Sequence, residues 1–180
     1  SKSFKINAVD YEDNQHFFIG QYFNNHYDGA LLQYPLINSK IAINRIEVWV
    51  LDQGSGDFQA QKTIVGVRDL GEGAPTAYPD NSVNTVYRDV SNLTGIRDVT
   101  TAYNSIKNQS LYDAATGTNQ PYQEGENFIF NRRARKLSEN EFRYHPQLGY
   151  ISLNQRLNDN QLLAVSFSYT INGDDSKVYK

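Results

Sequence analysis

The chain of 180 residues suits one domain with a core large enough to fold without disulfides or metals. It has no Cys, which excludes thiol catalysis, Cys-ligated zinc and disulfides. A formal net charge of −3, with 21% charged residues, indicates an ordinary surface and offers no electrostatic case for nucleic acid or for an anionic membrane.

The ends and the hydropathy of the chain suggest where it comes from. It begins at Ser1 and contains no Met, so we expect a single soluble domain, residues 1–180, cut from a much longer protein. No apolar run approaches the roughly 20 residues that cross a bilayer as a helix, and no secretory signal peptide stands at the start.

The first third of the chain predicts a strand and then a helix. Alternation over Ser3–Tyr11 favours an opening strand. From Gln15 to Leu32 apolar residues recur at steps of three and four, which predicts an amphipathic helix capped by Asp13 or Asn14. The residues of its stripe are Phe18, Ile19, Tyr22, Phe23, His26, Tyr27, Ala30 and Leu31.

Two histidines fall on this predicted helix. His16 and His26 would point the same way but lie about 15 Å apart along the axis, so they could not share a metal ion. We expect both to be partly buried beside aromatic side chains. Gly29 lowers helix stability and predicts a break in the helix at that point.

A strand is predicted at 43–51, where Ile46, Val48 and Val50 alternate with polar neighbours. Trp49 lies on the more polar face, where its ring could be a ligand platform or, as we favour, pack against a neighbouring element. The loop at 52–57 has two carboxylates but not the spacing of a calcium loop. We expect the strand at 62–70 to pair with 43–51 across that loop.

The middle of the chain is predicted to be helical and then irregular. Residues 71–81 are rich in turn formers and predict an exposed crossover. Apolar spacing over 83–106 favours a helix pair, or one helix broken near Gly95. The polar stretch 107–126 predicts a long surface loop.

A basic run follows on a predicted strand at 127–137, with Arg132, Arg133, Arg135 and Lys136 as the only concentrated positive charge. Nucleic-acid sites usually extend such a run over a basic, aromatic-rich face, and this chain is acidic overall. We therefore expect a solvated strand edge that resists aggregation. Together with Trp49, the three arginines form a candidate interaction surface.

The C-terminal part, residues 133–173, predicts a three-stranded β meander. Its strands are a short one around Phe142–Tyr144, a second at 149–153 with Ile151 inward, and a third at 162–171. Pro146 ends the first of them. The whole pattern predicts an α+β fold, a mainly antiparallel sheet covered by two or three amphipathic helices.

The sequence contains no recognisable catalytic motif. No Ser stands in a G-x-S-x-G turn, and there is no Gly-rich phosphate loop or zinc-binding H-E-x-x-H pattern. Clusters that form only on folding escape such a search. We predict no catalytic residues, no metal ligands and no cofactor.

Two rival functions remain. The stronger is a carbohydrate-binding β-sandwich that uses Trp49 and exposed Tyr residues as stacking platforms. The weaker is a hydrolase that uses His145.

Four separated blocks resemble the SprA (Sov) family of gliding-motility proteins, in the same order. They are HFFIGQYFNNHYD at 16–28, INRIEVWV at 43–50, VRDLGE at 67–72 and ARKLSENEFRYHPQLGYISLNQRL at 134–157. The stretch 74–125 carries no such resemblance. The family supplies the outer-membrane translocon of the type IX secretion system in Bacteroidetes.

The resemblance implies a non-enzymatic piece of that translocon, on the extracellular or periplasmic side of the outer membrane. Its partners would be other regions of the translocon, its partner subunits and exported protein cargo in transit. Helices interleaved with the strands favour a soluble insert over barrel wall, because transmembrane barrels are built from successive segments of about 10 residues with a lipid-facing side.

Overall fold

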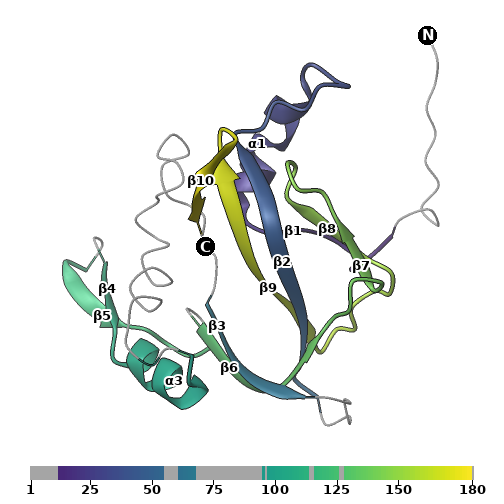
Figure 1. The fold of residues 1–180 in the computed structure, drawn as a ribbon. Helices are drawn as coiled ribbons and strands as arrows, with labels where there is room; N and C mark the ends of the chain where they lie inside the picture. Colours follow the sequence, from purple (N-terminus) through teal and green to yellow (C-terminus); the bar gives the residue numbers. More distant parts are fainter. Residues whose placement is uncertain are drawn as a thin grey trace.

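The computed structural model describes residues 12–54, 61–67, 95, 97–113, 116–125 and 128–179. Within them the chain is an α+β fold whose named strands all pair antiparallel, as predicted (Figure 1). The predicted strand at 3–11, the crossover at 71–81 and the first half of the helical region at 83–106 lie outside the described residues.

The larger sheet has five strands in the order β10-β9-β2-β6-β3. Its centre is the long pair β2 (Ile41–Asp52) and β9 (Gln161–Ile171), which places Val48 opposite Val165. The predicted alternation of both strands is confirmed. The inward residues of β9 are partly buried against the main core; they are Leu163, Val165, Phe167 and Tyr169.

A bulge in β2 explains how its whole length contributes to one core. The register shifts between Ile43 and Arg45, so Asn44 is the additional residue on that strand. Because side chains alternate along a strand, one extra residue exchanges the two faces. Ile43 before the bulge and Val48 after it are therefore both buried in the same cluster.

The position of β6 (Phe128–Lys136) corrects two predictions. This strand lies between β2 and β3 (Lys62–Val67), so β3 does not pair with β2. For the same reason the basic run lies on an interior strand rather than a sheet edge. Ala134 on β6 is fully buried, and a small side chain there suits a position flanked on both sides. Neighbours in sequence predict a hairpin, but a strand from later in the chain takes the place between them.

The second sheet has three strands in the order β1-β8-β7. The predicted pairing of β7 (Phe142–Tyr144) with β8 (Tyr150–Leu153) is confirmed. The predicted three-stranded meander is wrong, because β9 leaves for the larger sheet. The other neighbour of β8 is instead β1 (His16–Phe18).

Helix α1 (Gln21–Leu31) is shorter than predicted, since β1 occupies the first part of the expected stripe. Its N-cap is Gly20, which makes no side-chain capping bond, so Asp13 and Asn14 are not caps. The predicted break does not occur, and the helix continues two residues beyond Gly29. Burial of Phe23 and Ala30 stabilises the helix through packing instead.

The main core is enclosed by α1 and the two sheets (Figure 1). Gly149 lies at its closest contact, because a Cβ there would stand 2.0 Å from the Phe23 ring. Its φ of +62° also favours glycine. Eleven buried residues form this core: Ile19, Phe23, Ile41, Ile43, Val48, Val50, Leu137, Phe142, Ile151, Leu153 and Leu157.

The other helix among the described residues, α3 (Val99–Lys107), confirms the second half of the predicted helical region. It packs over β3 and β6 around a smaller cluster of Ile106, Tyr122 and Phe128. The predicted surface loop at 107–126 is wrong where β4 (Ser110–Asp113) and β5 (Thr118–Pro121) form a hairpin. At the end of the chain, β10 (Asp174–Tyr179) pairs with β9.

Neither helix in the described part of the chain has the length and apolar character needed to cross a membrane.

Candidate interaction surface

The four predicted interaction residues lie on two neighbouring strands but do not form one patch. Trp49 stands opposite Lys136, and Val50 stands opposite Arg135. Because side chains alternate across a strand, Trp49 and Arg135 point to opposite faces of the sheet. The structure therefore separates the aromatic from this part of the basic run.

Trp49 lies among charged side chains on one face of the larger sheet. The Lys62 ammonium lies 5.9 Å from the centroid of the indole ring, a cation–π contact. A sugar that stacked on that face of the ring would have to displace the Lys62 ammonium. Two residues earlier, Glu47 accepts hydrogen bonds of 2.8 Å from Lys136 Nζ and Arg45 Nη2. The hydrogen bond from Lys136, with the charges nearby, lowers the pKa of Glu47.

Arg132 and Arg133 have different surroundings. Arg132 is exposed and its guanidinium lies 5.5 Å from the Phe130 ring centroid. Arg133 is half-buried, with Nη2 3.9 Å from Asp52 Oδ2. That nitrogen is buried and makes no hydrogen bond within the described residues. A contact of 3.9 Å is charge pairing without a hydrogen bond.

Asp52 has a structural role at the end of β2. Its Oδ1 accepts hydrogen bonds from the backbone N–H of Gly54, at 2.6 Å, and from Asn160 Nδ2, at 3.1 Å. These donors join the end of β2 to the turn that precedes β9. They engage the carboxylate that a calcium loop would need, while the other predicted acid, Asp57, lies outside the described residues.

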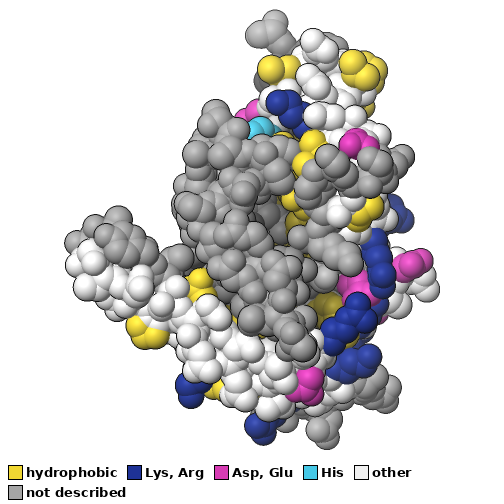
Figure 2. Space-filling view, turned by 60° about the vertical axis from the view of Figure 1, so that its left-hand side comes forward, with side chains coloured by type: hydrophobic (Ala, Val, Ile, Leu, Met, Phe, Trp, Pro, Cys, Tyr) yellow, Lys and Arg dark blue, Asp and Glu magenta, His cyan; other side chains and the backbone are white. Residues whose placement is uncertain are grey.

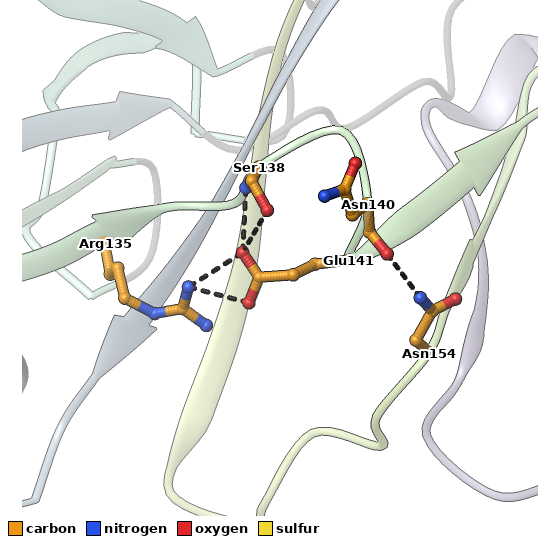
Figure 3. A network of polar contacts seen from close by, with 5 residues as sticks. All are labelled: Arg135, Ser138, Asn140, Glu141 and Asn154. Carbon is orange, nitrogen blue, oxygen red and sulfur yellow. Dashed lines mark hydrogen bonds and ion pairs between the residues drawn. The ribbon is translucent and has the colours of Figure 1, made fainter.

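Arg135 is held by a network at the turn between β6 and β7 (Figure 3). Its Nη1 donates to both carboxylate oxygens of Glu141, at 2.8 and 3.1 Å. The N–H and hydroxyl of Ser138 donate to Glu141 Oε2 at 2.8 and 2.9 Å. The Ser138 N–H is the main cause of a lowered pKa at Glu141. Nearby, Asn154 Nδ2 donates to the backbone carbonyl of Asn140. Arg135 thus stabilises a turn.

One polar cluster was not predicted, because strand pairing creates it. His16 and Ser152 are cross-strand partners on β1 and β8, with His16 Nδ1 2.9 Å from Ser152 Oγ. The other ring nitrogen of His16 contacts the carboxylate of Glu12. A Ser, a His and a carboxylate in this order have the connectivity of a hydrolase triad.

The surroundings of this cluster do not support acyl transfer. The side chains of His16 and Glu12 are 50% and 63% exposed, on the outer face of a sheet. Acyl transfer depends on donors preorganised for the oxyanion in a site that excludes water. Two shallow depressions of about 300 and 430 Å³ lie among the described residues, and Ser152 lines neither of them. We interpret the cluster as a cross-strand hydrogen-bond chain. No sequence signal could have found it, since its partners are 136 residues apart.

The remaining histidines have local roles. His145 Nδ1 accepts from the backbone N–H groups of Gln147 and Leu148, at 3.3 and 3.2 Å, and so caps the turn before β8. His26 bonds the Tyr22 carbonyl and stacks on the Tyr22 ring, with centroids 4.1 Å apart. The prediction of a half-buried histidine beside aromatics is confirmed for His26. It is wrong for His16, which is exposed on a strand.

The described residues contain no group of three His, Cys, Asp or Glu side chains arranged to hold a metal ion. No protein-family model matches the chain, and a comparison with characterised proteins finds no match either.

Proposed function

We propose that this chain is a non-catalytic, architectural domain of an outer-membrane protein-secretion translocon of the SprA (Sov) type. One observation carries the proposal: the blocks that resemble this family supply most of the main core. Two of its buried residues fall in block 16–28, three in block 43–50 and five in block 134–157, leaving only Ile41. The resemblance therefore follows the residues that decide the fold.

The polar contacts favour an architectural role over a catalytic one. Arg135 and Glu141 fix a turn, Asp52 ties two strand ends together, and His145 caps a loop. Groups engaged in this way stabilise the local geometry of the fold. The domain would act by occluding the translocon pore, bracing neighbouring regions or binding partner subunits. Exported cargo would pass it in transit, on the extracellular or periplasmic side.

The test is made in the intact parent protein. Ile151→Asp places a charge in a fully buried site and should unfold this domain. Ser152→Ala, on the next residue of the same strand, is the matched control, because it removes an outward-facing hydroxyl and its hydrogen bond to His16 without changing the core. We expect cargo export to fail with Ile151→Asp and to continue with Ser152→Ala, at equal abundance of the parent protein.

Normal export by the Ile151→Asp variant, or by a parent lacking the segment, would overturn the proposal. The parent gene in which these 180 residues are encoded provides a separate check. A short parent gene without the strands of an outer-membrane translocon would contradict the assignment whatever the export assay shows.

A further inference from the structure

The turn that follows α1 carries the most exposed large hydrophobic side chains of the described residues. Leu32 is 83% exposed, Tyr34 78% and Leu36 65%, whereas no other described residue of this kind exceeds 54%. Pro35 lies between them and is also exposed. We call Leu32, Tyr34, Pro35 and Leu36 the apolar tip.

The apolar tip projects from the body of the molecule. In Figure 1 the segment after α1 extends beyond both sheets at the top of the view. Figure 2 shows hydrophobic side chains at the same end of the molecule with uncharged surface between them, and Lys or Arg and Asp or Glu side chains directly below them. A convex projection can enter a fluid layer without a partner of complementary shape. A groove, in contrast, needs such a partner to fill it.

The sequence around the apolar tip is free of charge. From Gly29 to Ser39 no residue is Asp, Glu, Lys, Arg or His, and Asp28 and Lys40 are the nearest ionised residues on either side. Inserting these residues into an apolar layer would therefore bury no charge. Ala30 within this stretch is buried, so the uncharged residues that could enter such a layer are the exposed ones of the turn.

Two backbone donors of the apolar tip are paired within the turn itself. The N–H of Tyr34 donates to the Leu31 carbonyl at 3.0 Å, and the N–H of Leu36 donates to the Gln33 carbonyl at 3.0 Å. Pro35 has no N–H to satisfy. A segment that enters lipid must pair its backbone donors internally, because the hydrocarbon offers no partner.

We propose that the apolar tip inserts into the interfacial layer of a lipid membrane. Leu32 and Leu36 would reach the acyl boundary, and the Tyr34 hydroxyl would stay at the level of the headgroups. A protein partner fits less well, since a specific protein interface takes about 20–30 residues a side and the tip offers one turn. The proposal rests on these contacts and exposures, and it does not depend on the secretion function.

The absence of basic residues in the apolar tip predicts which lipids the protein needs for membrane binding. Anionic lipids attract Lys and Arg clusters, and that attraction is screened by salt. Binding through the apolar tip should therefore occur on zwitterionic phosphatidylcholine vesicles. It should also change little when the salt concentration rises.

The first experiment is vesicle flotation of the 180-residue chain with phosphatidylcholine. We expect association that falls at least about tenfold in a Leu32→Ser/Leu36→Ser variant, since burying one Leu side chain is worth about tenfold or more in a partition constant. The matched control is Leu162→Ser/Val178→Ser, which removes two exposed apolar side chains elsewhere and should leave association unchanged. Circular dichroism melting checks that each variant is folded.

A second experiment reports on the tip directly. The chain has one Trp, so Trp49→Phe combined with Tyr34→Trp moves the only indole to the tip. We expect its emission to shift to shorter wavelength with vesicles and to be quenched by brominated acyl chains. An unshifted, unquenched emission with saturating vesicles would overturn the proposal. So would binding that needs anionic lipid and disappears with salt, or a tip that a protein partner captures while vesicles do not bind.

Discussion

The two hydrophobic clusters of this protein are held in different ways. The main core under α1 contains eleven buried residues and is crossed by backbone bonds between distant segments, such as Ile43 N–H to the Pro146 carbonyl at 2.9 Å. The cluster under α3 contains three buried residues. The two helices that cover these clusters also differ in how their first turns are capped. No side chain caps α1, whereas Asp98 accepts from the Thr101 N–H at 2.8 Å at the start of α3.

The difference shows whether each helix is stabilised by local capping or by tertiary packing. A helix of 11 residues is marginal by itself, and α1 has neither a capping side chain nor an acidic first turn to support its start. Its existence depends on the core that it covers. Helix α3 has a capping residue, Asp98, at its start, although its position was predicted from apolar spacing and not from this cap.

The largest expected effect comes from Gly149→Ala, which should strain the contact between α1 and the β7–β8 turn. The positive φ at this position and the overlap with the Phe23 ring together should lower the free energy of unfolding by about 4 kcal/mol. Urea unfolding followed by circular dichroism measures the loss. A loss below about 1 kcal/mol would mean that α1 moves easily and that the main core is looser than described.

The next test compares the two clusters directly with one substitution type. Ile151→Ala in the main core should cost about 4 kcal/mol, and Ile106→Ala in the smaller cluster about 2 kcal/mol, within the usual range for Ile→Ala. Both side chains are almost fully buried, so the difference reflects how far the surroundings can relax. Equal losses in urea unfolding would show that the smaller cluster packs as rigidly as the main core.

Gly29→Ala should stabilise the protein by about 1 kcal/mol, because Ala is the better helix former. A Cβ at this position would have nothing within 4 Å, so no clash offsets the gain. The midpoint of thermal unfolding should rise. Together with Gly149→Ala, this variant separates a glycine required by packing from one that is not, and destabilisation by Gly29→Ala would contradict the helix through this position.

A smaller effect is expected from pH at the β6–β7 turn. The folded protein lowers the pKa of Glu141, so it holds this proton less tightly than the unfolded chain does. The resulting stability is present above the unfolded pKa of about 4.3 and is lost as pH falls through the folded pKa. Glu141→Gln should flatten the pH dependence of unfolding below about pH 4.5. An unchanged pH profile would show that other carboxylates dominate it.

The smallest effect should be local to α3. Asp98→Ala removes the hydrogen bonds to Thr101 and should speed amide exchange in the first turn of α3. Exchange in α1 should not change, because the clusters are separate. Faster exchange in both helices would mean that the two clusters unfold together.

The sequence predicted the parts of the fold whose signal is local. Alternation identified β2 and β9, including which of their residues face the core, and it identified the β7–β8 pair. Repeated spacing identified α3, with Gly95 before its start. Alternation also placed Trp49 on the more polar face of its strand, but it could not say which face the arginines share with Trp49, because that depends on the pairing of β6 with β2.

Only the tertiary structure decided which strands are neighbours. Nothing local says that β6 lies between β2 and β3, that β9 leaves β8 for β2, or that His16–Phe18 adds a strand instead of a helical turn. Each strand can pair with several others at similar backbone cost, and the choice falls to the pairing that buries the apolar faces together. That choice also separates Trp49 from Arg135 and brings His16 to Ser152. Periodicity is therefore a property of the sequence, whereas adjacency is a property of the folded core.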